Sequence, residues 1–97
     1  MHSDFSSELL FKLKKKAESY NITFLAIFGS YARNEQKKDS DVDILVSFME
    51  TPSLLTLIQI ENDFSQICNK KVDLVTIDSL NPFIKNQVLK EMKVIYN

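Results

Sequence analysis

The sequence predicts an α/β (α+β) domain in which a small β-sheet is flanked by helices. Segments with apolar residues at helical spacing alternate with short runs rich in β-branched and aromatic residues. The 97 residues, 44% of them hydrophobic, suffice for one domain with a small core, expected over 1–97. Turn signals separate the segments, including a solitary glycine. This alternation is typical of a sheet covered by helices.

The first half of the chain is expected to begin with an amphipathic helix and to reach its first strand after Asn21. The predicted segments are, in order, a helix over residues 4–20, a strand over 23–28, a short helical turn over 31–35 opened by Gly29 and Ser30, and a polar loop over 35–40.

Two capping residues followed by proline mark helix starts in the second half. In Thr51-Pro52 and in Asn81-Pro82, a side chain able to cap the helix precedes a proline suited to the first helical position. The predicted segments are a strand over 42–48, a helix from Thr51 to about 69, a strand over 71–77, a helix from Asn81 to about 91, and a short closing strand over 94–96.

Composition excludes several classes of function. A net charge of −1 argues against a dedicated nucleic-acid binder, so no direct nucleic-acid binding is expected. The single cysteine, Cys68, allows neither an internal disulfide nor a cysteine metal cluster. No apolar run approaches the ~20 residues of a membrane span, and the polar start is unlike a secretory signal. We therefore expect a cytoplasmic protein that does not enter the membrane.

Gly29, Ser30 and Arg33 form a candidate phosphate site. A glycine between a strand and a helical turn lets a ligand approach the backbone, where N–H groups at the start of the turn favour an anion. Ser30 adds a hydroxyl there, and Arg33, one turn later, adds a charge that contacts phosphate oxygens in pairs. A glycine-serine pair after a strand is also common in turns that bind no ligand, so this fragment alone does not decide the function.

Asp41 and Asp43 form a candidate metal site. Residues two apart on a strand point to the same face, with Cα atoms about 6.5–7 Å apart. Two carboxylates that converge there repel each other, and Mg²⁺, commonly held by one or two carboxylates plus substrate phosphates, fits between them. The alternatives are a solvated strand entrance, or neutralisation by Arg33 alone. The preceding glycine-serine turn favours the metal.

Asp73 is a third candidate acid. It lies within Val72-Asp73-Leu74-Val75, where its neighbours favour a core and an unpaired aspartate is costly. On a strand beside that of Asp41 and Asp43, it would complete the metal site and accept a proton from an attacking hydroxyl. An edge-strand acid, or an ion pair with Lys70 or Lys71, is the alternative.

The tyrosines, Tyr31 among them, are candidates for the surface or for stacking on a nucleotide.

These motifs together resemble a known superfamily. Gly29-Ser30-x-Ala32-Arg33, followed after a short loop by Ser40-Asp41-x-Asp43-Ile44, resembles the signature of the DNA polymerase beta-type nucleotidyltransferases. The small size and Lys71-Val72-Asp73-Leu74-Val75 are similar to the minimal nucleotidyltransferases that serve as antitoxins to HEPN-domain ribonucleases. One position departs from the pattern: the glycine usual after the arginine is Asn34, which tolerates the left-handed conformation better than most residues.

The resemblance implies a nucleotidyltransferase fold with a mixed sheet, and a role for each motif residue. Gly29 and Ser30 would hold the triphosphate of ATP, Asp41 and Asp43 would bind Mg²⁺, and Asp73 would match the third acid. The family's antitoxins transfer AMP from ATP to a tyrosine of the cognate HEPN toxin, neutralise it and form hetero-oligomers with it.

Alternative functions stay open at this point. The chain is expected to leave no room for a separate substrate domain once the nucleotide site is built, which favours a protein acceptor. The rivals are a binding antitoxin that only covers its toxin, and a small-molecule nucleotidyltransferase working as a homodimer. Phe11, Leu55 and Ile60 lie off the main helix faces, so some of them are candidates for a partner interface.

Overall fold

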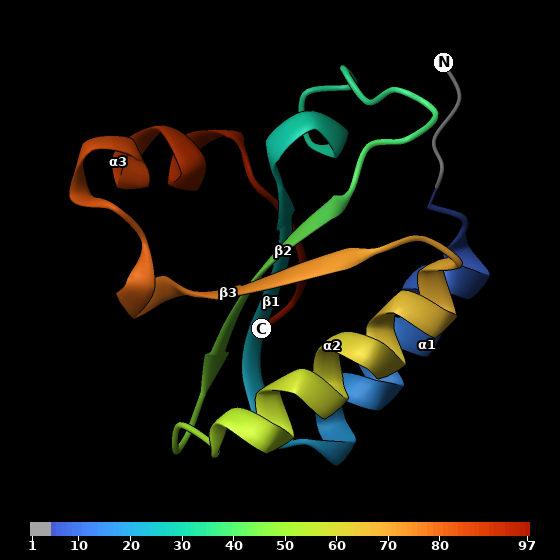
Figure 1. The fold of residues 1–97 in the computed structure, drawn as a ribbon, viewed down its shortest axis with the longest axis vertical. Helices are drawn as coiled ribbons and strands as arrows, with labels where there is room; N and C mark the ends of the chain where they lie inside the picture. Colours follow the sequence, from blue (N-terminus) through green and yellow to red (C-terminus); the bar gives the residue numbers. More distant parts are fainter. Residues whose placement is uncertain (1–4) are drawn as a thin grey trace.

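A computed structural model describes residues 5–97, which form helices packed on a four-stranded sheet (Figure 1). The elements are α1 Ser7–Ser19, β1 Ile22–Phe28, a 3₁₀ turn Gly29–Tyr31, β2 Val42–Phe48, α2 Leu54–Cys68, β3 Val72–Thr76, a 3₁₀ turn Ile77–Ser79, α3 Pro82–Glu91 and β4 Lys93–Tyr96. The predicted α/β class and order of elements are confirmed. The predicted start of the first helix, Asp4, lies outside the described residues.

The sheet is mixed, as the family resemblance implied. Its strand order is β3-β2-β1-β4, with β1 antiparallel to both β2 and β4 and β2 parallel to β3. Because α2 carries the chain back between β2 and β3, these two strands run in the same direction. Their amino-terminal ends therefore meet, and each of these ends bears an acid of the predicted site.

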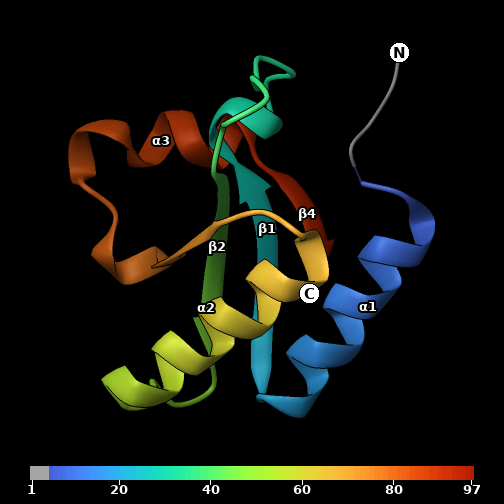
Figure 2. The same ribbon diagram turned by 45° about the vertical axis from the view of Figure 1, so that its right-hand side comes forward.

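The two faces of the sheet are covered unequally. On one face, α1 and α2 lie side by side, while α3 lies on the other near the upper end of β1 (Figure 2). The α1–α2 face holds the larger buried cluster, with Phe64, Leu13 and Ile44 fully buried. The α3 face holds a smaller cluster around Ala26 and Leu45. The alternation along β2 explains this division, since Asp43 and Leu45 share the face opposite Val42 and Ile44.

One of the two predicted helix caps is correct and the other is wrong. Asn81 caps α3, accepting from the N–H of Phe83 at 2.9 Å, with Pro82 at the helix start as predicted. In α2 the cap is Ser53 rather than Thr51, since the Ser53 hydroxyl accepts from the N–H of Thr56 at 3.2 Å. Serine caps as well as threonine, and capping by Ser53 starts the helix at the apolar Leu54.

Asparagines take the left-handed positions that glycine usually fills. Asn21, Asn34 and Asn69 all have φ between 54° and 59°. Asn69 ends α2, where the N–H of Lys70 donates to the carbonyl of Ser65 at 3.3 Å. The left-handed backbone anticipated at Asn34 is therefore confirmed, and the chain manages its turns with a single glycine.

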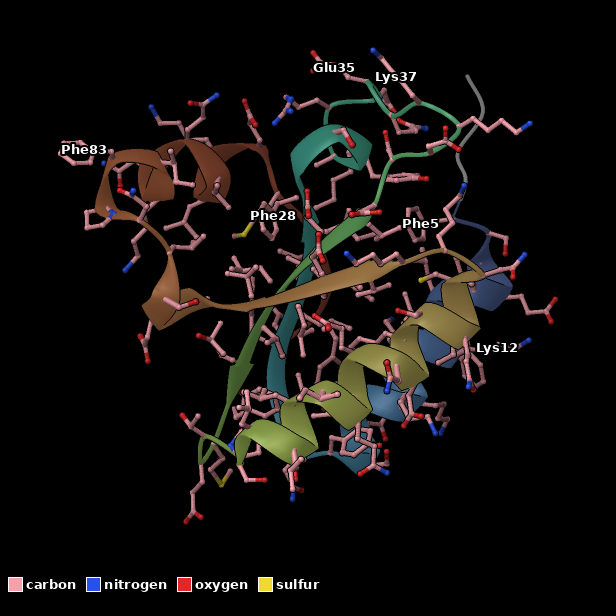
Figure 3. The ribbon with its side chains drawn as sticks, viewed as in Figure 1. Phe5, Lys12, Phe28, Glu35, Lys37 and Phe83 are labelled. Carbon is pink, nitrogen blue, oxygen red and sulfur yellow. The ribbon has the colours of Figure 1, made fainter. Side chains whose placement is uncertain are left out.

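The three candidate interface residues divide. Phe11 and Leu55 are exposed, whereas Ile60 is fully buried and belongs to the α2 side of the core, so its assignment to a partner interface is wrong. Phe83 on α3 is the most exposed of the large apolar residues described, at 96%, and projects away from the sheet (Figure 3).

Within residues 5–97, none of the helices is both long and apolar enough to cross a lipid bilayer.

Candidate active site

Gly29 lies directly after β1, where its lack of a side chain admits an acid. Its φ of +73° is the left-handed conformation that glycine adopts without strain. A Cβ added at this position would collide with the Oδ2 of Asp43. The close approach arises because Phe28, the residue before the glycine, is paired with Asp43 across the β1–β2 ladder. Gly29 thus brings the end of β1 and the Asp43 carboxylate together.

The turn that follows is shorter than predicted and begins earlier. A 3₁₀ turn runs over Gly29–Tyr31, in place of the helical turn expected over residues 31–35. It ends in a Schellman-type pattern, in which the N–H of Glu35 donates to the carbonyl of Ser30 at 2.8 Å and the N–H of Asn34 to that of Tyr31 at 3.4 Å. Asn34, in the left-handed conformation, ends the turn before it grows into a helix.

The three predicted acids meet at the amino-terminal ends of β2 and β3. Asp43 and Asp73 are partners in the parallel ladder, so their side chains lie next to each other on the same face. Asp41 lies just before β2, where the N–H of Val42 donates to the carbonyl of Lys71 at 2.9 Å. The Lys71 ammonium is 3.9 Å from Oδ2 of Asp41 and 4.0 Å from Oδ1 of Asp73. The alternative considered for Asp73, an ion pair with Lys71, is therefore present.

The surroundings of Asp43 disfavour its charged form. Burial raises the pKa of the Asp43 carboxyl, the charges of Asp73 and Asp41 raise it further, and only Arg33 lowers it. Lys71 is 71% exposed, so its two long ion pairs compensate little of this repulsion. Across residues 5–97, no three acidic, histidine or cysteine side chains already stand in a metal-coordinating group. The three acids are thus neighbouring carboxylates with excess negative charge.

Arg33 is tied to two glutamates. Its Nε donates to Oε1 of Glu35 at 3.0 Å, and its Nη1 donates to Oε2 of Glu91, near the end of α3, at 3.2 Å. These hydrogen bonds fix the plane of the guanidinium group near the Gly29 turn. The contact with Glu91 was missed by the sequence reasoning, because 58 positions separate the two residues and only the fold brings them together.

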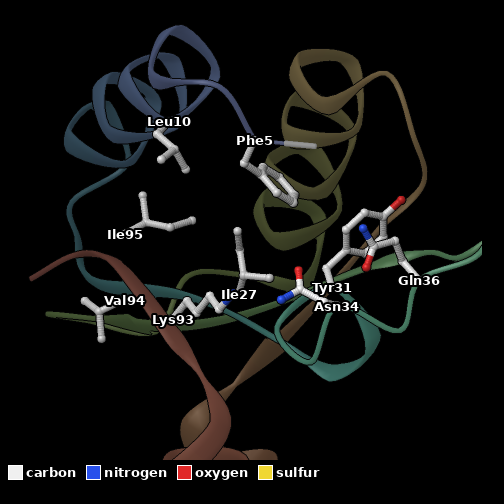
Figure 4. A pocket seen from close by; sticks show the side chains of 9 residues that line it. All are labelled: Phe5, Leu10, Ile27, Tyr31, Asn34, Gln36, Lys93, Val94 and Ile95. Atoms are coloured by element: carbon white, nitrogen blue, oxygen red, sulfur yellow. The ribbon is translucent and has the colours of Figure 1, made fainter. Parts of the chain in front are cut away.

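Tyr31 is not available to stack on a nucleotide. Its side chain is only 5% exposed and packs edge-to-face on Phe5, with ring centroids 5.6 Å apart. It lines a pocket of about 130 Å³ beside α1 and β4, shown in Figure 4, and belongs to the α1–α2 side of the core. The stacking role considered for Tyr31 is therefore wrong, because the turn directs this ring into the core.

Two side chains of α2 hold the strand that carries Asp73. The Ser65 hydroxyl accepts from the N–H of Val72 at 3.0 Å, and Oε2 of Glu61 accepts from the N–H of Leu74 at 2.8 Å. These bonds flank Asp73 and satisfy outward-facing donors of an edge strand. The sequence reasoning did not single out either residue. Their four-residue spacing on a helix just before the strand was the available signal.

Sequence comparisons match the chain to one family and to named relatives. The polymerase beta nucleotidyltransferase family matches residues 11–97. A Methanocaldococcus jannaschii protein named as a candidate protein adenylyltransferase is 47% identical over 87 residues, which cover 88% of this chain and 89% of the relative. Protein adenylyltransferase MntA of Thermococcus cleftensis is 44% identical over 79 residues, covering 81% of this chain and 80% of that protein.

Solved structures share the fold. A toxin–antitoxin complex crystallised with AMP-PNP includes a chain with a TM-score of 0.79 at 23% identity, covering 91% of this chain and 73% of the other. A chain in a complex of the tri-AMPylated Shewanella oneidensis HEPN toxin with MNT antitoxin gives a TM-score of 0.72 at 21% identity. The match covers 93% of this chain and 71% of the other. At these identities the likeness establishes the architecture of helices on a mixed sheet.

Proposed function

The chain belongs to the polymerase beta nucleotidyltransferase family, and we propose that it acts as an antitoxin that transfers AMP from ATP to a hydroxyl of a cognate HEPN ribonuclease toxin. The acceptor hydroxyl is that of a tyrosine, and the modification neutralises the toxin. Relatives at 47% and 44% identity carry the name protein adenylyltransferase, which supports this donor and this class of acceptor. The fold shared with antitoxins in toxin complexes supports the choice of partner.

The observation that carries the proposal is the in-register pair of Asp43 and Asp73 beside Gly29. The first N–H groups of a helical turn lack partners within the turn, so the turn at Gly29 and Ser30 offers donors to a phosphate. Arg33 adds positive charge at the same end of the sheet. In this proposal the triphosphate lies along the turn, with its α-phosphorus facing the acids.

The transfer replaces one phosphorus–oxygen bond by another. The acceptor oxygen attacks the α-phosphorus in line, the bond to the pyrophosphate oxygen breaks, and pyrophosphate leaves with that electron pair. Asp73 accepts the proton of the acceptor hydroxyl, a role suited to an acid that is neither fully buried nor locked in a close ion pair. Asp73 is accessible from outside, as a protein acceptor requires, since its side chain is 43% exposed.

The donor set suits Mg²⁺. Three carboxylates with excess negative charge provide the hard oxygen ligands that this ion prefers, and an ammonium group is already drawn to within 4.0 Å of two of them. Asp41, Asp43 and Asp73 would hold the ion, which when bound offsets the charge of the phosphates. The chain's own contribution is to hold the acids side by side at the ends of two adjacent strands.

We further propose that the protein acts in the cytoplasm as part of a hetero-oligomer with its toxin. ATP, the donor, is plentiful there. The exposed apolar side chains of Phe11 and Leu55 offer contact area for a protein partner.

Labelled ATP tests the reaction. The protein is incubated with its co-purified partner, Mg²⁺ and ATP labelled at the α-phosphate, and the partner is then analysed by intact mass and peptide mapping. We expect label on the partner and an added mass of one or more AMP groups on tyrosine. Tight association without label would establish a binding antitoxin in place of an enzyme. Label on a small acceptor in the absence of any partner would establish a small-molecule transferase.

A further inference from the structure

A second cavity adjoins the phosphate turn and has no role in the chemistry described so far. It has a volume of about 210 Å³ and lies between α3 and the end of β1. Figure 2 shows the carboxy-terminal part of α3 beside the Gly29 turn. Pockets for whole drug-sized ligands typically measure about 300–1,000 Å³, so this cavity is suited to one part of a ligand. Its contact with Gly29 places it next to the proposed triphosphate.

The lining of the cavity is suited to a flat aromatic group. Phe28, Ile84 and Val88 contribute apolar surface, and the Phe28 ring can stack on such a group. The polar side of the lining consists of Arg33, Gln87 and Glu91. An apolar slot with a few polar groups at one side is how proteins commonly bind a nucleobase.

The polar residues form a chain of hydrogen bonds that determines how Gln87 is oriented. Nε2 of Gln87 donates to Oε1 of Glu91 at 3.1 Å, and Nη1 of Arg33 donates to the other oxygen of Glu91 at 3.2 Å. The bond from Gln87 and the bond from Arg33 both lower the pKa of the Glu91 carboxyl, which is therefore ionised at neutral pH. An ionised carboxylate only accepts hydrogen bonds, so Gln87 must direct its NH₂ group to Glu91. Its carbonyl oxygen then points away from Glu91.

We propose that the cavity between α3 and the Gly29 turn is the subsite for the base of the nucleotide, and that Gln87 selects adenine through its carbonyl oxygen. Adenine presents an amino group at the position where guanine presents a carbonyl oxygen. A carbonyl acceptor at Gln87 therefore pairs with adenine and repels guanine. Glu91 is the positioning residue, because it holds the Gln87 amide and the Arg33 guanidinium at the same time.

This inference rests on the proposed function, since it takes a nucleoside triphosphate as the ligand. The experiment therefore measures binding and needs no toxin. The whole chain is titrated with fluorescently labelled, non-hydrolysable ATP and GTP analogues in the presence of Mg²⁺. We expect the wild type to bind the ATP analogue more tightly. Gln87→Met removes the acceptor at similar length and should weaken binding of the ATP analogue by about 3- to 10-fold, the worth of one hydrogen bond. It should strengthen binding of the GTP analogue, because the repulsion between the Gln87 carbonyl and the guanine carbonyl is removed.

Two further variants sharpen the test. Gln87→Lys replaces the acceptor by a donor and should shift the preference toward GTP. Glu91→Ala frees the Gln87 amide to rotate and should also reduce the ratio of ATP to GTP affinity. The matched control is Asn86→Ala, which removes an exposed amide of the same helix outside the cavity and should leave both affinities unchanged.

The outcomes separate the two proposals. If the wild type binds ATP and GTP equally well, or if Gln87→Met and Gln87→Lys keep its preference for ATP, Gln87 does not read the base and the inference is overturned. Transfer of AMP to the toxin would still stand in that case. If the protein binds neither analogue but associates tightly with its toxin, both proposals fail, because the nucleotide site does not function.

Discussion

The two faces of the sheet differ in how completely they are closed. Towards α1 and α2, thirteen buried residues of the described chain form one cluster, and the fully buried Phe64 lies within it. Towards α3, only four buried residues cluster. The acids, Gly29 and Arg33 lie beyond that small cluster, at the end of the sheet where α3 leaves room for a ligand. The same strands therefore have a closed side and an open side.

This difference separates the source of stability from the source of chemistry. The charge repulsion around Asp43 disfavours folding, and it is borne by a sheet whose opposite face is tightly packed. No polar or charged residue among residues 5–97 is fully buried, so the acids remain reachable. We expect substitutions on the closed face to change stability more than the activity of the folded protein, and those on the open face to do the reverse.

Removing the ring of Phe64 should have the largest effect. Phe64→Ala deletes the largest fully buried side chain from the α1–α2 core and should lower the free energy of unfolding by about 3–5 kcal/mol. The whole free energy of unfolding of such a domain is typically about 5–15 kcal/mol, so the variant should be close to unfolding. Urea unfolding followed by circular dichroism measures the change.

Phe83→Ala is the matched control for that prediction. Phe83 is the same residue type, but it lies 96% exposed on α3, so its removal should change stability by no more than about 0.5 kcal/mol. Equal losses in the two variants would show that the α3 side contributes as much packing as the α1–α2 side. The contrast between a closed and an open face would then be lost.

Asp43→Asn should have the next largest effect, chiefly on activity. The amide keeps the size of the side chain but removes a charge from the carboxylate cluster, so AMP transfer should fall by about 10²–10³-fold, as when one electrostatic contact to the transition state is removed. Label transfer to the partner measures the rate. Asp39→Asn, an exposed aspartate in the preceding loop, should retain full activity. Full activity in Asp43→Asn would contradict the mechanism.

Local signals in the sequence predicted much of this arrangement. The strand expected over residues 42–48 is β2 as observed, and Asn81-Pro82 starts α3 as expected, because alternation and capping are read within a few neighbouring residues. The grouping of Asp41, Asp43 and Asp73 followed from placing two strands side by side, which the structure confirms for Asp43 and Asp73.

Contacts between distant segments could not be predicted in the same way. Glu91 meets Arg33, and Glu61 meets the N–H of Leu74, only after helices have packed on the sheet. The burial of Tyr31 depends on where a 3₁₀ turn points its ring, which spacing along the chain does not specify. The features that the sequence did not predict are thus tertiary contacts. They include the side chains that hold Arg33 and the strand of Asp73 in place.

Ser53→Ala should have a smaller effect, and on the closed face. The substitution removes the cap of α2, the helix that covers the core, and should cost about 1 kcal/mol of stability without changing the transfer rate of the folded protein. Thermal unfolding measures this loss. Thr51→Ala, at the position where the sequence alone placed the cap, should have little effect. A larger loss in Thr51→Ala would mean that α2 starts earlier in solution than in the structure.

The smallest effect is a dependence of folding stability on pH, which arises from the charge repulsion at Asp43 on the open face. Because the pKa of Asp43 is raised in the folded protein, the folded state holds this proton more tightly than the unfolded state does. Stability attributable to Asp43 is therefore highest below about pH 4, near the ordinary value, and falls as the pH rises through the folded-state value. Since the carboxyl is partly exposed, the change should stay below about 1 kcal/mol.

Asp43→Asn isolates this contribution. At neutral pH without divalent cations, the variant should be slightly more stable than the wild type, and the difference should vanish towards pH 3. Added Mg²⁺ should stabilise the wild type more than the variant, because only the wild type keeps the full set of carboxylates. Asp78→Asn, an exposed aspartate beyond the end of β3, should show neither behaviour. A wild type more stable than Asp43→Asn at neutral pH without Mg²⁺ would mean that Arg33 and Lys71 already compensate the acids, and that the open face carries no electrostatic cost.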